Sequence, residues 1–435
     1  QLLITPKLRR MITLGGDIRL DNKSNVSIET ALSENDINLF SSLAKANDQG
    51  LGLRLHYDRK TSLSADTLNG WTVNSKVDYE FAGKNFKALE PYRSPEFARD
   101  WNVSGLSTIN DENILSMEAL LNKIDLGNIG YYLKTYQRGN QYAGWNHGLH
   151  SNLHFRNYIF TGNGNYLKSN GSINKSEFFR HQLDLNKSIS NSISLGIKEN
   201  SENNQFKYPG TDSLLKTSYS WQEYYGYSTY KDSSGNKANV SFKHRIDKGV
   251  KLNDLFKAAE ANELTATGEL SGNPKNTFKI TSSYRNLKVL DTLLISTPEL
   301  QTLVNRIDHQ INLVDGFINA VTFYEISSGR DRKQEFYYLE VPAGQGSYAY
   351  IGDLNGNNVQ DLNEFAIANY SDQAKYIRVY FNSDQYFATR SNAFSEVLNI
   401  NPSSFRRNNK NLSLWQRFSN QLILRLDKKT SGENI

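Results

Sequence analysis

Apolar and polar residues alternate along this chain in segments of roughly 8 to 12 residues, separated by short runs rich in Asn, Asp, Ser and Gly. The clearest segment is 71–81, where Trp, Val, Ser, Tyr and Phe alternate with Thr, Asn, Lys, Asp and Glu. Successive side chains of a β-strand point to opposite faces, so each segment predicts a strand with one apolar and one polar face. Other segments of this kind are 12–20, 26–32, 51–57, 149–159, 179–185, 193–197, 221–230, 238–247, 278–284 and 412–426.

Composition supports an all-β chain with one wet face. The apolar share is only 38%, yet aromatic residues reach 12%, and disordered chains are poor in aromatic residues. Strands of about 9 to 11 residues span a bilayer, whereas soluble strands average about 5 or 6. We therefore expect an all-β fold: an antiparallel β-barrel or large curved sheet of outer-membrane type, with a few short helices in loops. A soluble β-sandwich with wet outer faces stays open.

The chain divides into five successive regions. We expect N-terminal β-hairpins over 1–87, a long loop over 88–112, strands over 113–328, a calcium-binding-type loop over 329–370 and C-terminal strands over 371–435. Apolar residues at helical spacing predict a helical insert at 250–263, and a weaker helix at 37–46. Segment 298–313 fits either a helix or a strand. No leader precedes Gln1 and no terminal aromatic strand closes the chain, so we expect one continuous structure cut from a longer chain.

The segment 353–364 has the ligand spacing of a twelve-residue calcium loop. Calcium requires six to eight hard oxygen ligands on a tightly curled segment, and a closing Glu supplies two of them. The usual glycine at the sixth position is replaced by Asn358, which tolerates a left-handed backbone. The alternative is an Asn- and Gly-rich turn that binds no metal. The predicted calcium ligands are Asp353, Asn355, Asn357, the backbone carbonyl of Val359, Asp361 and Glu364.

Other candidate sites are weaker. The absence of Cys excludes disulfides and thiol nucleophiles, and the interspersed charges, +5 in net, give no stripe for nucleic acid. Gly344, Gly346 and Ala349 match a dinucleotide glycine pattern, but no helix follows it. We interpret His147, His150 and His154 as water-facing side chains rather than a zinc site. Two aromatic clusters fit strand packing or a membrane girdle better than sugar platforms: Tyr131, Tyr132, Tyr136, Tyr142 and Trp145, and Trp221, Tyr224, Tyr225, Tyr227 and Tyr230.

Three motifs carry a family resemblance. They are E-F-Y-Y-L-E-V-P-A-G-Q-G-S-Y at 335–348, the calcium-type loop followed by D-Q-A-K-Y-I-R-V at 372–379, and E-P-Y-R-S-P-E-F-A-R-D-W-N at 90–102. The first two resemble a segment of very large, mostly uncharacterised cell-envelope β-proteins of Bacteroidota. The third is similar to a signature of giant outer-membrane translocon-like barrels. The resemblance covers about 65 residues and implies an outer-membrane or cell-surface setting without implying a reaction.

These observations lead to one functional hypothesis and two rivals. We expect a non-catalytic component of an outer-membrane β-barrel, with a role in transport, assembly or scaffolding at the cell surface. Its partners would be outer-membrane lipid and other envelope proteins, and its cofactor Ca²⁺. The first rival is a soluble, calcium-dependent β-sandwich module for adhesion or binding. The second rival is a glycan-binding or glycan-degrading protein.

Overall fold

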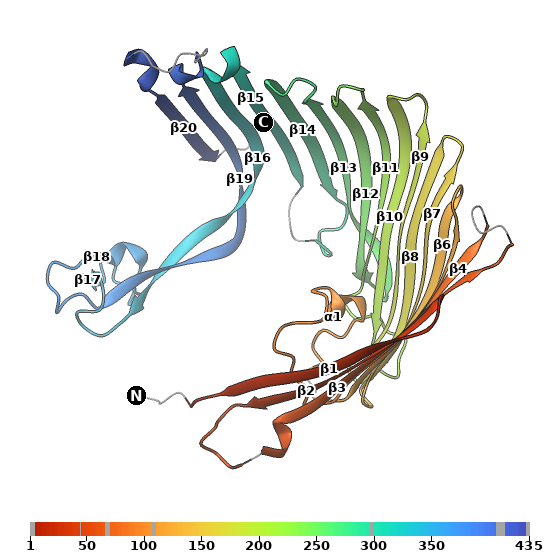
Figure 1. Ribbon diagram of the computed structural model, residues 1–435. Helices are drawn as coiled ribbons and strands as arrows, with labels where there is room; N and C mark the ends of the chain where they lie inside the picture. Colours follow the sequence, from red (N-terminus) through yellow and green to blue (C-terminus); the bar gives the residue numbers. More distant parts are fainter. Residues whose placement is uncertain are drawn as a thin grey trace. The chain divides into compact units, whose positions relative to one another are not determined.

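The computed structural model describes residues 5–43, 45–65, 70–106, 110–295, 299–405 and 414–431. These residues form an all-β fold of antiparallel strands with one short α-helix and a few 3-10 turns (Figure 1). The chain divides into two compact units, Gln1–Gly272 with Arg285–Leu300 and Asn273–Tyr284 with Gln301–Ile435. Within the described residues, no helix is long and apolar enough to cross a membrane.

Unit 1 is a single antiparallel sheet in which each strand pairs with the next along the sequence. Among its described residues, β1 pairs only with β2, so this sheet is open at that edge. Its strands are β1 (Leu8–Asp21), β2 (Ser24–Asp36), β3 (Gln49–Ser62), β4 (Thr72–Ala82), β5 (Glu112–Lys123), β6 (Gly127–Arg138), β7 (Tyr142–Phe155), β8 (Tyr158–Gly171), β9 (Lys175–Ser188), β10 (Ile193–Lys207), β11 (Tyr219–Lys231), β12 (Lys237–Lys251) and β13 (Asp254–Leu270).

The two faces of the unit 1 sheet differ in chemistry, as the alternation predicts. One face exposes large apolar side chains at alternate positions, for example Leu14 at 71% and Ile197 at 64% exposure. We call it the apolar face. The opposite, polar face carries charged pairs such as Arg54 with Asp78 and Arg245 with Glu223. The predicted strand at 71–81 is confirmed as β4.

Unit 2 contains a long antiparallel hairpin. Strand β16 (Ile318–Glu340) pairs with β19 (Tyr376–Ile400), and β15 (Leu300–Leu313) and β20 (Asn420–Ser431) flank them. The short strands β17 (Tyr348–Tyr350) and β18 (Phe365–Ile367) lie at one end of this hairpin (Figure 1). Strand β14 (Asn276–Val289) has residues in both units. The remaining elements are α1 (Phe97–Asp100), η1 (Lys45–Asn47), η2 (Val314–Gly316), η3 (Leu362–Glu364), η4 (Pro402–Phe405) and η5 (Leu414–Arg417).

Aromatic side chains pack the end of unit 2 that carries β17 and β18. The rings of Tyr338 and Phe365 stack with centroids 4.1 Å apart. The Arg378 guanidinium lies 4.6 Å from the Phe336 ring and 4.7 Å from the Tyr348 ring. Stacking and cation–π contacts each favour a fixed geometry, so this cluster holds the two short strands on the hairpin.

The helix predicted at 250–263 is wrong. Residues 237–270 form a β-hairpin whose tip is Leu252 and Asn253, with φ values of 50° and 64°. Two consecutive left-handed residues are the signature of a tight hairpin turn whose twist matches the flanking strands. A register shift between Asp247 and Lys248 also interrupts the alternation of apolar and polar residues. The apolar residues of this hairpin are therefore spaced in the sequence like those of a helix.

Two other expectations need correction, and one open alternative is resolved. The described part of 37–46 forms turns and the start of η1 instead of a helix. Residues 300–313, which fitted either a helix or a strand, form a strand. The loop predicted at 329–370 is shorter, because β16 continues to Glu340 through its pairing with β19. In this loop, pairing with a neighbouring strand overrides a weak local pattern.

Candidate functional site

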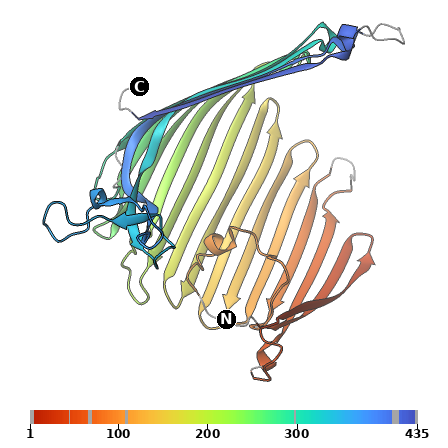
Figure 2. The same ribbon diagram turned by 90° about the vertical axis from the view of Figure 1, so that its left-hand side faces the viewer.

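The segment between β4 and β5 lies over the polar face of unit 1 (Figure 2). We call residues 90–106 the strap. Its Trp101 and Val103 are buried against side chains of the sheet, and the Tyr142 hydroxyl donates to the carbonyl of Trp101. The sheet residues beneath the strap occupy polar-face positions and would be exposed without it. These sheet residues are Tyr136, Tyr142, Leu167 and Phe178.

Buried amides lock the strap to β9 and β10. Asn102 has a left-handed backbone, with φ of 53°, a conformation that Asn adopts more readily than most residues. Its Nδ2 donates to Ser176 Oγ and to Asn204 Oδ1, each at 2.8 Å, and Asn204 Nδ2 returns a bond of 2.9 Å. All three side chains are buried. Each amide therefore satisfies the other where water has no access.

Ion pairs of two arginines link the strap to the sheet. Arg93 of the strap lies 2.6 Å from Glu80 and 3.3 Å from Glu112. On the other side, Arg180 of β9 lies 2.8 Å from Asp100 in α1. These pairs are half-buried, so solvent screens them less than pairs on an open surface. The strap is thus fixed by charge at Arg93 and Asp100 and by apolar packing at Trp101 and Val103.

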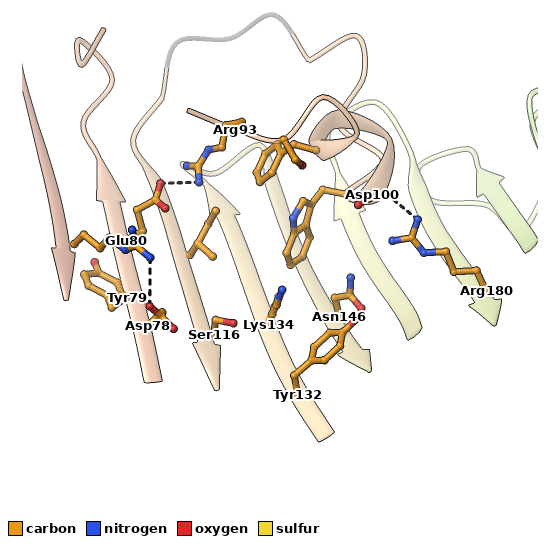
Figure 3. A pocket seen from close by; sticks show the side chains of 15 residues that line it. Asp78, Tyr79, Glu80, Arg93, Asp100, Ser116, Tyr132, Lys134, Asn146 and Arg180 are labelled. Atoms are coloured by element: carbon orange, nitrogen blue, oxygen red, sulfur yellow. Dashed lines mark hydrogen bonds and ion pairs between the residues drawn. The ribbon is translucent and has the colours of Figure 1, made fainter. Parts of the chain in front are cut away.

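A cavity of about 340 Å³ remains between the strap and the sheet (Figure 3). Its lining carries charges of both signs, and its three carboxylates are engaged. Asp78 lies 3.7 Å from Arg54, while Glu80 and Asp100 pair with Arg93 and Arg180. The cavity therefore has a polar lining whose carboxylates already have cationic partners, and it can hold water or a small polar solute.

The calcium-type loop folds around two of its acidic side chains. The carboxylate of Asp353 accepts backbone N–H bonds from Gly356, Asn357 and Asn358. These bonds, chiefly that of Asn358, hold the pKa of Asp353 below its ordinary value of 3.8. Asn358 adopts the left-handed backbone predicted for it, with φ of 56°. The tight turn that a calcium loop needs is thus present.

Oxygen-bearing side chains converge within this loop. Both Asn355 Nδ2 and Asn357 Nδ2 donate to the same oxygen of Asp361, at 2.8 and 2.9 Å. Rotation of both amides by half a turn would direct their oxygens to this point instead. Val359 donates its backbone N–H to Asn357. Asn355, Asn357 and Asp361 therefore meet at one position, and the Asp353 carboxylate lies on the adjoining turn.

Glu364 does not have the open carboxylate that the predicted calcium ligand would need. It is fully buried, and its two carboxylate oxygens accept the backbone N–H groups of Leu354 and Asp361. Tyr350 also donates to it, at 3.3 Å. Glu364 thus joins the start of the loop to its end. Within the described residues, no three His, Asp or Glu side chains form a group arranged to hold a metal ion.

The histidines and aromatic clusters divide between the two faces of the sheet. Tyr131 and His147 contact each other on the apolar face, at 2.8 Å, whereas His150 lies 3.6 Å from Glu118 on the polar face. In the first aromatic cluster, Tyr136 and Tyr142 pack beneath the strap. In the second, Trp221 stacks under Arg245 on the polar face. Neither cluster forms one continuous aromatic platform.

Comparison with known protein families and with curated proteins gives no match for this chain. The candidate sites therefore depend on geometry alone. Sequence reasoning identified the strap motif only through a resemblance and missed its anchors. The sequence does contain a signal for these anchors. Leu167 and Phe178, which pair across β8 and β9, are apolar residues at polar-face positions. Such exceptions indicate that another segment covers the sheet.

Proposed function

We propose that this chain is part of a non-catalytic outer-membrane β-barrel-type protein, with the apolar face of unit 1 against lipid. One observation carries the proposal. From β1 to β13, large apolar side chains stay exposed on one face while the other face is polar and carries the strap. Exposed apolar patches larger than a few hundred Å² are rare on soluble monomers and mark interaction surfaces. Alternation of apolar and polar side chains is the pattern of a transmembrane β-sheet.

Strand length supports this proposal. The strands of unit 1 have 11 to 17 residues, which exceeds the about 9 to 11 residues that a tilted strand needs to cross a bilayer. A polar face of this extent would line an aqueous space, with the strap inside it. We infer a role in transport, assembly or scaffolding at the cell surface, together with other envelope proteins.

Dependence on detergent tests the proposal. The chain, expressed with any flanking sequence it has in the cell, is extracted from membranes and exchanged into buffer without detergent. We expect aggregation without detergent and a β-rich circular dichroism spectrum with it, because the apolar face needs hydrocarbon cover. Co-sedimentation with vesicles after a urea wash is the second readout. A chain that stays monomeric and folded in plain buffer would overturn the proposal and favour the soluble module.

We also propose that Ca²⁺ binds the loop at 353–364. Asn355, Asn357 and Asp361 meet at one position, Asp353 lies on the adjoining turn, and hard oxygen ligands on a tight turn suit this ion. Calcium would compete with the backbone N–H groups for the Asp353 carboxylate. Glu364 would keep its present hydrogen bonds and hold the loop closed beneath the ion.

A further inference from the structure

A hollow of about 470 Å³ opens on the apolar face of unit 1. Its floor is Gly162 and Gly164 of β8, which stand opposite Ser151 and Leu149 of β7. A Cβ on Gly162 would lie 2.9 Å from Ser151 Oγ and 3.1 Å from the Phe160 ring. Only glycine at positions 162 and 164 therefore leaves the floor of the hollow open. The walls are Tyr131, Phe160, Tyr166, Phe179 and Leu183.

The surroundings of the hollow are apolar on one side and polar on the other. Strand register places an apolar row across β7 to β10 on one side, formed by Leu153, Phe160, Leu185 and Ile197. On the other side, Phe179 of the wall stands opposite Asn203, which in turn stands opposite Ser220. The hollow thus lies where the hydrocarbon-like surface ends.

His181 adds an unmatched polar atom at this border. Its Nδ1 is buried and has no hydrogen-bond partner, while its Nε2 lies 3.5 Å from Glu199 Oε1. A buried polar atom without a partner costs free energy, so a turn of the His181 ring that lets a ligand's hydrogen-bonding group meet Nδ1 is favoured. A purely hydrocarbon ligand would leave this cost in place.

We propose that the hollow binds one membrane phospholipid, with an acyl chain on the glycine floor and the ester and headgroup region toward His181 and Asn203. The proposal rests on the proposed function, because the hollow is continuous with the surface assigned to lipid. An amphiphile matches the order of apolar and polar rows. The volume is in the range of small-ligand sites and is too small for a transmembrane helix.

Native mass spectrometry tests this site. Delipidated protein in detergent is titrated with dioleoylphosphatidylethanolamine, using wild type, Gly164→Leu and Gly226→Leu. Leu at 164 fills the hollow, where a Cβ meets the His181 Cβ at 3.3 Å. Leu at 226 adds the same hydrocarbon to an exposed apolar-face position with nothing within 4 Å. We expect the tightest lipid to bind Gly164→Leu at least about fivefold more weakly than the other two proteins, which is roughly the effect of one or two lost CH₂ contacts.

The outcomes separate the lipid site from the proposed function. Equal lipid affinity in three proteins that all insert into vesicles overturns the lipid site alone. A wild-type protein that stays folded and monomeric in plain buffer overturns the proposed function. If Gly164→Leu does not fold, wild type is labelled with a photoactivatable phospholipid. Label confined to 145–185 supports the site, whereas uniform label over β1 to β13, or a crosslink to another polypeptide at the hollow, overturns it.

Discussion

Asn102 and Asn204 exchange two side-chain hydrogen bonds, 2.8 and 2.9 Å long, although 102 positions separate them in the sequence. Asn102 belongs to the strap and Asn204 to β10. Both amides are buried, so each supplies the partner that water cannot. This reciprocal pair fixes where the strap crosses the sheet.

Replacement of Asn204 by Ala should loosen the strap. It leaves the Asn102 amide partly unsatisfied, which costs about 1 to 3 kcal/mol. We expect faster proteolysis within 90–106 while β-sheet content is retained. Asn203→Ala, on the other face of β10, is the control and should leave proteolysis unchanged. Equal protection of the strap in both variants would contradict the role of this pair.

Trp101→Ala should release the strap further. Truncation of a buried Trp costs about 3 to 5 kcal/mol, and Trp101 is only 6% exposed. We expect increased hydrogen exchange of strap amides and of β6 to β9 beneath it. Trp145→Ala removes the same side chain from the apolar face, where Trp145 is 53% exposed, and should not alter exchange in the strap. Unchanged exchange in Trp101→Ala would show that the apolar contacts do not hold the strap.

A charge on the apolar face should oppose membrane insertion. Ile197→Arg places a cation at an exposed apolar-face position and should cost about 2 to 4 kcal/mol if that position lies near the middle of the bilayer. Thr161→Arg places the same charge on the polar face of β8 and serves as the matched control. The measurement is the fraction that folds into vesicles across a urea series. Equal folding of the two variants would argue against lipid contact.

Calcium should protect the loop from proteases. We expect slower cleavage within 344–380 when Ca²⁺ replaces chelator, and titration calorimetry should detect binding. Asp353→Ala should abolish both effects, because it removes a ligand and the acceptor of three backbone bonds. Asp372→Ala, outside the loop, is the control. Identical cleavage of wild type with calcium and with chelator would remove the metal from the proposal.

The loop should also open in acid without metal. The pKa of Asp353 is lowered in the folded state, so the ionised carboxylate contributes stability above the ordinary pKa of 3.8. This contribution is lost as the pH falls through the pKa that Asp353 has in the folded loop, which lies below 3.8. We expect hydrogen exchange at Gly356 and Asn358 to increase, beyond its intrinsic pH dependence, below about pH 4. An Asp353→Asn variant should lack this transition, and a wild-type loop without one would contradict the assignment.

The sequence by itself determined the all-β class, the strands at 221–230 and 238–247 and the division of side chains between two faces. It could do so because the period of two is a local property of each strand. The left-handed backbone of Asn358 and the turn of the calcium-type loop are local as well. Each depends on residues within a few positions of one another.

Only the tertiary structure decided what depends on distant residues. The apparent helix at 250–263 became a strand because pairing with β12 satisfies its backbone, and propensity is too weak to resist such pairing. The course of the strap follows from Asn102 meeting Ser176 and Asn204, and from Trp101 covering Leu167 and Phe178. Glu364 became a buried brace rather than an open ligand because the fold brings two backbone N–H groups to its oxygens. The alternation of apolar and polar residues along a strand does not encode such contacts, because the same alternation occurs whichever segment covers the sheet.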